Sequence, residues 1–336
     1  MSLRALVLTA GLGTRLRPLT YVRAKAAVPV NGETLARRAV RWLVSQGITE
    51  IVLNLHHRPD TVTASVGDGA DMGARVRYSW EQPVLGSAGG PRHALPLLVD
   101  RLPYAPLPPR AEVSPQAGPE TFVIVNGDTL TDVDLASMSR HHAESGALAT
   151  MALIPNPRPD IYGGVLLDDA GRVSRFTRAG VDRESYHFIG VQFTEARVFA
   201  GLADGVPAES VNALYPRLIR SDPGSVAAFV CDARFQDIGT PADYLRTSVQ
   251  LAGVEGDRLI AGRNVRIADS AVVRGSAVWD DVVIGARSRL TDCIVADGAR
   301  IPSDAVYERC AILPAAGCAA AEGERVVDGL LIAPIR

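Results

Sequence analysis

The sequence predicts an α/β protein with a mixed, mostly parallel sheet, followed by a short parallel β-helix. Two patterns carry this prediction. Short apolar segments alternate with helical segments through about the first 250 residues, and a six-residue hydrophobic repeat follows from about residue 256. Strands that alternate with helices build parallel sheets, whereas a period of six residues is typical of a β-helix.

The first segments indicate a strand, a glycine-rich turn, a helix and a second strand. Residues 4–9 contain the apolar run ALVL, which is typical of a buried parallel strand. We expect a helix over residues 34–46, ended by Gly47, and a strand in IVLNL at residues 51–55. Three further segments continue the alternation: a strand over residues 76–80, a helix over residues 88–98 and a strand in FVIVNGD at residues 122–128.

A proline-rich segment interrupts this alternation. Residues 102–119 contain six prolines. Because proline lacks the backbone N–H that helices and central strands need, the segment is neither. We expect an exposed insertion loop, with a lid or a partner contact as the alternative.

The last quarter of the chain carries the hydrophobic repeat. Each coil of a β-helix buries only a thin core, so stacked neighbours must supply the rest of its stability. We place the domain boundary at residue 252, which gives domains of residues 1–252 and 253–336. The repeat slips in phase and resumes twice along its length: Ile267, Val273 and Trp279, then Ile284 and Leu290, then Val295 and Ile301.

The composition excludes several classes of protein. With a net charge of −2, the chain lacks the excess of positive charge that is typical of proteins that bind nucleic acid or an anionic membrane surface. No apolar run approaches the roughly 18 residues that span a bilayer, and the N-terminus lacks the order of a signal peptide. The four cysteines show no CxxC spacing, which favours a reduced protein over a disulfide or zinc framework. We expect a cytoplasmic location.

The turn after the first strand has the chemistry of an anion site. In GLGTRLRP, Gly11 and Gly13 let the backbone approach a ligand, and Arg15 offers a fork of donors to phosphate oxygens. The motif is neither a P-loop nor a dinucleotide fingerprint. Taken alone it fits a plain turn equally well. Lys25, the single lysine among 35 basic residues, follows shortly after.

Several ordered motifs extend this signal. LTAGLGTRLRPLT at residues 8–20, then Lys25, then VPVNG, resembles the sugar-1-phosphate nucleotidylyltransferases, although Ala24 and Ala26 replace the prolines that flank the family's lysine. The matching blocks continue in order along the chain: WEQPVLGSAGG at 80–90, VNGD at 125–128, YGG at 162–164, FIG at 188–190 and FQDIGTPADY at 235–244.

The resemblance implies a Rossmann-like nucleotidyltransferase domain and a left-handed parallel β-helix. The tail is similar to that of the mannose-1-phosphate guanylyltransferases. It further implies a reaction in which a nucleoside triphosphate (NTP) and a sugar 1-phosphate give a nucleotide sugar and pyrophosphate. Homo-oligomerisation through the β-helix is expected as well. A β-helix acyltransferase site is improbable, because all six histidines lie at or before His187.

Two polyanions meet in this reaction, so catalysis rests on neutralising and aligning charge. Mg²⁺ prefers one or two carboxylates together with phosphate oxygens. By resemblance, Asp128 and Asp237 are the expected metal ligands. Arg15 is expected to hold the departing pyrophosphate. Lys25, a compact point charge, is suited to bridging the two reacting phosphates.

The nucleotide site is expected to include Glu81, which stands where pyrimidine-using relatives carry glutamine. A carboxylate only accepts hydrogen bonds, so it suits the two adjacent donors of guanine and favours GTP. Similar enzymes that act on muramic acid phosphate use uridine nucleotides, which leaves UTP as the alternative. The nucleotide-binding set implied by the resemblance is Leu8, Ala10, Gly11, Gly13, Thr14, Arg15, Glu81, Gly86 and Ser87.

The sugar site departs most from the family. The family's EKP motif appears as Thr177, Arg178 and Ala179, which keeps a positive charge but loses the glutamate that binds sugar hydroxyls. A mannose 1-phosphate-like sugar is favoured, and its identity stays open. The implied sugar-phosphate-binding set is Lys25, Gly163, Arg178 and Gly190.

A non-catalytic sensor of nucleotide sugars is the competing hypothesis from another class. Such a protein would be expected to have lost a metal carboxylate or the basic residues of the loop. Arg15, Lys25, Asp128 and Asp237 are all present, which favours an enzyme.

Overall fold

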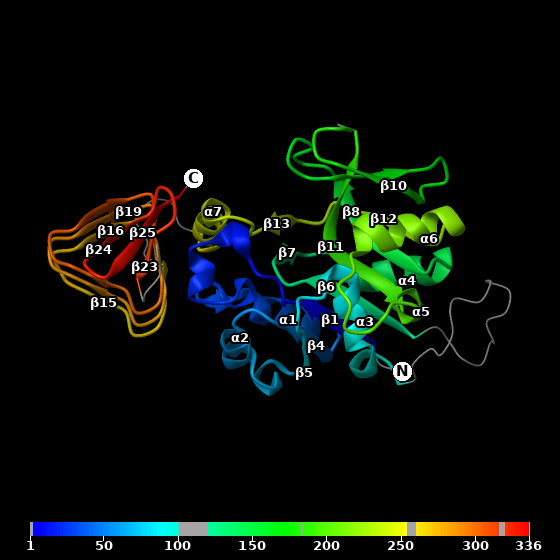
Figure 1. Cartoon of the computed structure of the whole chain (residues 1–336), viewed down its shortest axis with the longest axis horizontal. Coiled ribbons are helices and arrows are strands. Elements are labelled where there is room, and N and C mark those ends of the chain that lie inside the picture. The colour runs from blue at the N-terminus through cyan, green and yellow to red at the C-terminus, as the bar shows by residue number, and fades with distance from the viewer. Residues whose placement is uncertain (1–2, 101–119, 183, 254–259, 316–319, 336) are drawn as a thin grey trace. The chain divides into compact units, whose positions relative to one another are not determined.

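A computed structural model describes residues 3–100, 120–182, 184–253, 260–315 and 320–335. The chain divides into two compact units (Figure 1). Unit 1 comprises Met1–Gly11 and Arg38–Phe235, and unit 2 comprises Leu12–Arg37 and Gln236–Arg336. The loop that follows the first strand therefore belongs with the C-terminal part of the chain. The proline-rich segment and residues 254–259, which adjoin the predicted domain boundary, lie outside the described residues, so the division at residue 252 stays a prediction.

Unit 1 is built on one mixed sheet, whose central path is β10-β9-β11-β6-β1-β4-β5, with β8 and β12 beside β11. The apolar segments predicted as strands are confirmed as β1, β4, β5 and β6. The strands of this sheet are β1 (Arg4–Leu8), β4 (Glu50–Leu55), β5 (Arg75–Trp80), β6 (Thr121–Asn126), β8 (Ala149–Pro155), β9 (Gly164–Leu167), β10 (Val173–Thr177), β11 (Tyr186–Glu195) and β12 (Val226–Val230).

The sheet has a parallel half and an antiparallel half. β1 pairs in parallel with β4 and β6, and β4 pairs in parallel with β5. The ten-residue β11 runs antiparallel to β6, β8 and β9. Parallel and antiparallel pairs are therefore equally frequent among the described strands of this sheet. The sheet is mixed as predicted, but parallel pairing does not dominate it.

Helices connect these strands and bury their apolar faces against the sheet. The predicted helices over residues 34–46 and 88–98 are confirmed as α1 and α3, and α3 packs on β1, β4 and β5. A large apolar core that includes Leu6, Phe122 and Tyr215 fills the space between sheet and helices. The helical segments are α1 (Leu35–Ser45), α2 (Pro59–Val66), η4 (Ala70–Met72), α3 (Gly86–Leu98), α4 (Leu135–Ser145), α5 (Arg197–Ala200), the π-helix η6 (Ser210–Leu214) and α6 (Tyr215–Ser221).

Unit 2 begins with residues 12–30, which we call the signature loop. Three short 3-10 turns shape it, namely η1 (Thr14–Leu16), η2 (Leu19–Tyr21) and η3 (Lys25–Ala27). A hairpin of β2 (Pro29–Val30) and β3 (Glu33–Thr34) ends it. Much later in the chain, α7 (Pro241–Leu251) starts at a capping box in which Thr240 and Asp243 exchange hydrogen bonds, with Pro241 in its first turn.

The C-terminal coils, residues 260–314, form three stacks of short parallel strands. Each strand from β14 to β20 pairs with the strand 17 residues further on. This arrangement fits a parallel β-helix, and its left-handedness stays a prediction. The strands of this part are β14 (Ile260–Ala261), β15 (Arg266–Ile267), β16 (Val272–Arg274), β17 (Ala277–Val278), β18 (Val283–Ile284), β19 (Arg289–Thr291), β20 (Ile294–Val295), β21 (Arg300–Ile301), β22 (Val306–Glu308) and β23 (Cys310–Pro314), followed by β24 (Arg325–Val327) and β25 (Leu330–Pro334).

The 17-residue coil explains the phase slip in the repeat. Two steps of six residues and one of five complete a coil, so the repeat cannot keep a strict period of six. A strict period of six reaches Trp279, one residue beyond the position of Val278 that continues the stack. Val278 belongs to the core of the coils, whereas Trp279 is buried with its indole N–H donating to the hydroxyl of Tyr244 on α7 at 2.8 Å.

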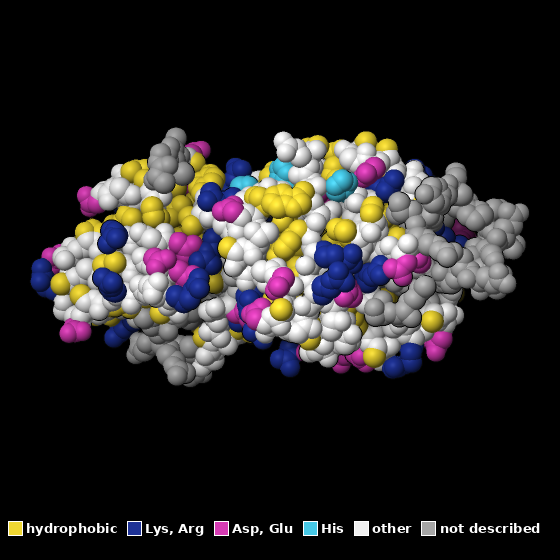
Figure 2. All heavy atoms as spheres, turned by 90° about the horizontal axis from the view of Figure 1, so that it is seen from below, with side chains coloured by type: hydrophobic (Ala, Val, Ile, Leu, Met, Phe, Trp, Pro, Cys, Tyr) yellow, Lys and Arg dark blue, Asp and Glu magenta, His cyan; other side chains and the backbone are white. Residues whose placement is uncertain are grey.

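Charged side chains of both signs are interspersed over the face of the molecule seen in Figure 2, with apolar side chains between them. This distribution agrees with the net charge of −2. Among the described residues, none of the helices combines the length and the apolar character needed to cross a membrane.

Candidate active site

The carboxyl ends of the parallel strands in unit 1 gather several of the predicted residues. Asp128 is half-buried in the turn between β6 and β7 (Thr129–Thr131). Just before it, the backbone N–H of Gly127 donates to the carbonyl of Leu8, the last residue of β1, at 3.0 Å. A Cβ on Gly127 would lie 2.7 Å from that oxygen, so glycine is required there. Asp128 and Leu8 thus share the sheet edge where ligands bind in open α/β folds.

The start of the anion-binding turn is held by Asn54, at the end of β4. Its side-chain oxygen accepts hydrogen bonds from the backbone N–H of Thr9 at 2.6 Å and of Ala10 at 3.3 Å. The Thr9 hydroxyl donates in turn to the Asn54 carbonyl. Ala10 is therefore fixed by the protein itself. Sequence reasoning missed Asn54, although an asparagine in an otherwise apolar strand is a signal, because a buried amide needs partners.

Glu81 belongs to the same network. Its side chain is buried, and its Oε1 accepts from Asn54 Nδ2 at 2.7 Å while its Oε2 accepts from the backbone N–H of Leu85 at 2.9 Å. Each carboxylate oxygen keeps a second lone pair. A hydrogen bond from the base of a nucleotide would therefore add to these two bonds. Glu81 also has a structural role, which sequence reasoning did not foresee.

Gly86 and Ser87 open α3. Gly86 has a φ of +76°, and a Cβ there would lie 2.6 Å from Oε1 of Glu209, so the left-handed backbone and the close approach both favour glycine. The Ser87 hydroxyl donates to Glu209 Oε2 at 2.7 Å and accepts from the backbone N–H of Ser210 at 2.9 Å. Glu209, missed from the sequence, thereby ties the start of α3 to the π-helix η6.

In unit 2 the signature loop folds back on itself through Gly13. This residue has a φ of +60°, and its carbonyl accepts from the hydroxyl of Thr20 at 3.1 Å. A Cβ on Gly13 would lie 2.7 Å from Thr20 Cγ2 and 3.1 Å from Lys25 Cβ. Glycine therefore lets this backbone lie against Lys25, whereas Gly11 and Thr14 are exposed.

Three of the four predicted catalytic residues meet in unit 2. Lys25 Nζ lies 4.0 Å from Asp237 Oδ1, and both side chains are largely shielded, at 14% and 16% exposed. The guanidinium of Arg15 approaches the same place, because a Cβ built on Gly239 would lie 3.1 Å from Arg15 Nη1 and 3.0 Å from Asp237 Oδ2. Gly239 leaves the space in which this carboxylate and the two cations come together.

The chemistry of the two predicted carboxylates suits a divalent metal ion. Asp128 and Asp237 offer the hard carboxylate oxygens that Mg²⁺ takes together with phosphate oxygens. The ammonium of Lys25 lies 4.0 Å from Asp237 Oδ1, so this carboxylate already stands beside one cation. Among the described residues, no three His, Cys, Asp or Glu side chains form a metal cluster. Each of the two carboxylates thus has the chemistry of a Mg²⁺ ligand, and their sharing of one ion stays a prediction.

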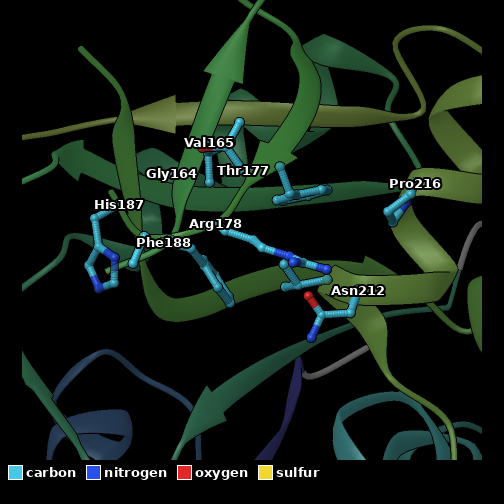
Figure 3. A pocket seen from close by; sticks show the side chains of 12 residues that line it. Gly164, Val165, Thr177, Arg178, His187, Phe188, Asn212 and Pro216 are labelled. Carbon is cyan, nitrogen blue, oxygen red and sulfur yellow. The ribbon is translucent and has the colours of Figure 1, made fainter. Parts of the chain in front are cut away.

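Unit 1 also contains a pocket of about 760 Å³, a size typical of small-ligand sites (Figure 3). The predicted residues Gly163 and Arg178 line it, and Arg178 extends across it toward Asn212 of the π-helix. Among the described residues that line it, Arg178 alone carries a full charge and none is a carboxylate. The other lining residues are Gly164, Val165, Phe176, Thr177, Ala179, His187, Phe188, Val211 and Pro216.

His187 lies in this pocket within an aromatic cluster. Its ring stacks on Tyr162 with centroids 4.4 Å apart and lies 4.8 Å from the ring of Phe235. Burial lowers the pKa of His187 to about 4, against a hydrogen bond to the Gly163 backbone that raises it. The imidazole is therefore neutral at pH 7. Its Nδ1 and the hydroxyl of Thr177, in the place of the family's glutamate, are buried without hydrogen bonds among the described residues.

Gly190 lies in β11, where the pairing with β8 shifts register between Phe188 and Gln192. It has a φ of +80°, and a Cβ there would lie 2.8 Å from both Asn126 Nδ2 and Thr129 Oγ1. Gly190 is thus required by the bulge, and its neighbour Phe188 lines the pocket; a part of Gly190 in sugar-phosphate binding stays a prediction.

Comparison with known proteins gives a consistent picture. The model of the nucleotidyl transferase family matches residues 4–253. A mannose-1-phosphate guanylyltransferase from Mycobacterium tuberculosis is 26% identical, over 91% of this chain and 83% of its own length. A UTP–glucose-1-phosphate uridylyltransferase from Synechocystis is 26% identical, over 98% and 87%. A D-glycero-α-D-manno-heptose 1-phosphate guanylyltransferase from Aneurinibacillus thermoaerophilus is 28% identical, over 74% and 98%.

A similar solved structure is that of HddC from Yersinia pseudotuberculosis. It superposes with a TM-score of 0.60 at 20% identity, and the match covers 74% of this chain and 99% of that one. This likeness supports a mixed α/β, Rossmann-like nucleotidyltransferase fold.

Proposed function

The chain belongs to the nucleotidyl transferase family, as a sugar-1-phosphate nucleotidylyltransferase, and from this premise we propose that it transfers GMP from GTP to a mannose 1-phosphate-like sugar. The products are then a GDP-sugar and pyrophosphate. Enzymes of this family generally use a divalent metal ion, and we propose Mg²⁺ for this chain.

The observation that carries the proposal is the cluster of Arg15, Lys25 and Asp237 in unit 2. Lys25 neutralises the α-phosphate of the NTP and the phosphate of the sugar, so that a sugar phosphate oxygen can attack in line. Arg15 holds the departing pyrophosphate through its fork of N–H donors. No nucleophilic side chain is needed, because positioning and charge neutralisation suffice for this class of reaction.

Asp128 and Asp237 are the carboxylates that would hold the Mg²⁺, and the ion would supply positive charge to the triphosphate. The chain's own contribution is the placing of these groups. Gly127 sets the turn that carries Asp128 against Leu8, and Gly239 leaves room for Asp237 beside Arg15. Asn54 fixes the backbone of Thr9 and Ala10 at the start of the anion-binding turn.

GTP is proposed because two relatives are named as guanylyltransferases and because Glu81 presents a carboxylate. The remaining lone pairs of Glu81 can accept from adjacent N–H groups of guanine. The names of these relatives, one acting on mannose 1-phosphate and one on a manno-heptose 1-phosphate, also support a manno-configured sugar.

A specific observation supports a second candidate, uridylyl transfer to N-acetylmuramate or another hexose 1-phosphate. Both oxygens of Glu81 already accept hydrogen bonds within the protein. The described residues that line the pocket include Arg178 but no carboxylate, which suits a sugar that carries an acidic substituent. A relative that uses UTP matches 98% of this chain.

A substrate screen separates these candidates. Purified protein with Mg²⁺ is supplied with GTP, UTP, ATP, CTP or dTTP against a panel of sugar 1-phosphates, and pyrophosphate release is recorded. The proposal expects the highest kcat/KM for GTP with mannose 1-phosphate. A preference for UTP with N-acetylmuramate 1-phosphate would replace it with the second candidate. Binding of nucleotide sugars without release from any pair would identify a sensor.

We also propose that the C-terminal coils join copies of the chain into a homo-oligomer. Val272 of β16 and Val306 of β22 support this: they lie in one stack, on either side of Arg289 of β19, and are 42% and 69% exposed. Apolar side chains of this exposure are available to a second copy of the chain.

A further inference from the structure

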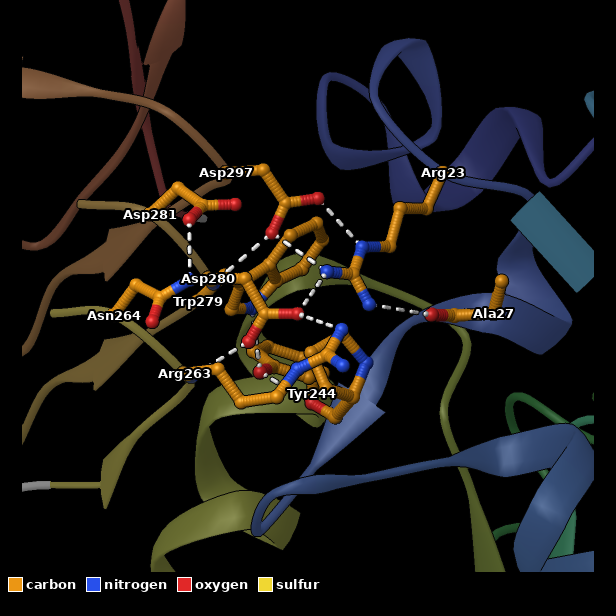
Figure 4. Close-up of polar contacts among 10 residues, drawn as sticks. Arg23, Ala27, Tyr244, Arg263, Asn264, Trp279, Asp280, Asp281 and Asp297 are labelled. Atoms are coloured by element: carbon orange, nitrogen blue, oxygen red, sulfur yellow. Dashed lines mark hydrogen bonds and ion pairs between the residues drawn. The ribbon is translucent and has the colours of Figure 1, made fainter. Parts of the chain in front are cut away.

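Arg23, two residues before Lys25 in the signature loop, is held by the C-terminal coils (Figure 4). Its Nε donates to Asp297 Oδ2 at 2.5 Å, and its Nη2 donates to Asp297 Oδ1 at 2.7 Å and to Asp280 Oδ2 at 2.9 Å. The pairing with Asp297 is bidentate, a geometry that a guanidinium can make and an ammonium cannot. Arg23 is thus clamped by two carboxylates.

The two carboxylates are themselves fixed by the coils. Asp280 and Asp297 occupy the same position in successive coils, and the backbone N–H of Asp280 donates to Asp297 Oδ1 at 3.0 Å. Arg263, one coil earlier, donates to Asp280 from its backbone at 2.7 Å and from its side chain at 3.0 Å. Residues from three coils therefore form the binding site of the Arg23 side chain.

A second contact holds the signature loop at Pro29, on the C-terminal side of Lys25. The hydroxyl of Tyr244, on α7, donates to the carbonyl of Pro29 at 2.7 Å and accepts from the indole N–H of buried Trp279 at 2.8 Å. The guanidinium carbon of Arg23 lies 5.6 Å from the Trp279 ring, a distance that allows a cation–π contact. Lys25 thus stands between two anchors that both lead to Trp279.

These contacts are shielded from water. The side chains of Arg23 and Asp280 are each 15% exposed, and that of Asp297 is 23% exposed. Burial lowers the pKa of the Arg23 guanidinium, but hydrogen bonds and charge from Asp297 and Asp280 outweigh it and raise the pKa overall. Removing one partner of a buried ion pair strongly destabilises a protein. Breaking the contacts of Arg23 with Asp280 and Asp297 therefore costs free energy.

We propose that Arg23, Asp280 and Asp297 are positioning residues, through which the C-terminal coils hold Lys25 in place for nucleotidyl transfer. This inference rests on the proposed function and gives the coils a part in catalysis besides oligomerisation. Arg23 Nη1 also lies 3.5 Å from the carbonyl of Ala27, at the end of the 3-10 turn that begins with Lys25. Arg23 thereby ties the end of this turn to Asp280 and Asp297.

The test compares two ion pairs of the same geometry. Arg23→Lys and Asp297→Asn break the clamp, by which we mean the contacts of Arg23 with Asp280 and Asp297. Arg287→Lys and Asp304→Asn break another bidentate ion pair within the coils, which does not involve the loop. In that pair Arg287 donates to Asp304 through Nε and Nη2, at 2.7 Å each. A displaced catalytic group can cost about 10²-fold in rate. We expect kcat to fall about 10- to 100-fold in the clamp variants and less than about twofold in the control variants.

A double variant distinguishes the positioning of Lys25 from an unspecific loss of activity. If Arg23 acts through Lys25, Arg23→Lys should add less than about twofold to the loss already caused by Lys25→Ala. A full additional loss in that background, or a kcat of Arg23→Lys within twofold of the wild type, would overturn the proposal.

Hydrogen exchange gives a readout that needs no turnover. Arg23→Lys should speed amide exchange in residues 20–30 at least about tenfold while leaving residues 300–313 unchanged, and Arg287→Lys should not affect the loop. An inactive wild type would refute the proposed function. The exchange data would still show whether Arg23 holds the loop in place. Unchanged exchange in the loop would refute the clamp whatever the activity.

Discussion

Lys25 shows how a single residue type is selected by its surroundings. Every other basic residue of the chain is arginine, yet a lysine stands 4.0 Å from Asp237 and beside the backbone of Gly13. An ammonium is compact and carries its charge at one point, whereas a guanidinium is wide and planar. In a space bordered by Gly13, Asp237 and Arg15, the compact cation fits better.

Substitution of Lys25 tests this reading. Lys25→Ala and Lys25→Arg should both lower kcat by about 10²- to 10³-fold, the usual cost of one lost contact to developing charge. Circular dichroism should show an unchanged fold. Arg17, an exposed cation of the same loop, provides the control, and Arg17→Ala should stay within about threefold of the wild type. Lys25→Arg at full activity would show that charge alone suffices.

At the scale of elements, buried polar residues decide how helices and strands pack. α4 lies against β8 through His142, whose Nδ1 pairs with the hydroxyl of Thr150 at 2.7 Å. β11 changes register at Gly190 and so carries Phe188 into the pocket. Neither feature follows from hydrophobic periodicity, because each depends on a partner that is distant in sequence.

The first element-scale prediction concerns acid stability. Burial and the charge of His141 lower the pKa of His142 to about 4, from 6.5 in an unfolded chain. Between pH 6.5 and 4 the unfolded state therefore binds the proton first, and the stability present above pH 6.5 is lost as pH falls. Urea unfolding should give a free energy of unfolding lower by about 1–2 kcal/mol per such histidine at pH 5 than at pH 7.

His187 has a similarly lowered pKa and adds to this loss. His142→Gln keeps a hydrogen-bonding side chain but removes one titration, so its stability should depend less steeply on pH over the same range. Equal slopes for the variant and the wild type would contradict the assignment.

The second element-scale prediction concerns the bulge in β11. Gly190→Ala places a Cβ against Asn126 and Thr129 at a positive φ, and should lower the free energy of unfolding by about 2–3 kcal/mol. Gly171 has a similar φ of +74° but no atom within 4 Å of its Cβ position. Gly171→Ala should therefore cost only about 1 kcal/mol. Equal losses in denaturant titrations would show that backbone strain alone matters at Gly190.

At the scale of the whole molecule, the division into units differs from the order of the sequence. The signature loop, early in the chain, belongs to the unit that contains the C-terminal coils. Arg15, Lys25 and Asp237 therefore come from one unit, although more than 200 residues separate the first from the last. Asp128, Glu81 and the pocket with Arg178 belong to the other unit.

The proposed assembly is tested at this scale. Val306→Asp places a charge on the exposed face of β22 and should reduce the mass measured by light scattering from that of an oligomer to that of the monomer. Val181, in unit 1, is similarly exposed at 65%, and Val181→Asp should leave the mass unchanged. A monomeric wild type at micromolar concentration would contradict the proposed assembly.

Much of this arrangement could be predicted from the sequence, and the exceptions have physical causes. Apolar runs predicted β1, β4, β5 and β6, because a buried strand must be apolar whatever its neighbours. The phase slips of the six-residue repeat are visible in the sequence, but the 17-residue coil that causes them is recognised only from the pairing of the strands. The roles of Asn54, Glu209 and Arg23 depend on partners 27, 122 and 274 residues away, which no local pattern reveals.

The most direct test of the central claim follows the phosphorus atoms. ³¹P NMR of the full chain with Mg²⁺, GTP and mannose 1-phosphate should show the triphosphate and the sugar phosphate disappearing together. Pyrophosphate and the two coupled resonances of a diphosphate sugar should appear in equal amounts, and Asp237→Ala should abolish both. Hydrolysis of the triphosphate without use of any sugar 1-phosphate, or full turnover by Asp237→Ala, would contradict the account.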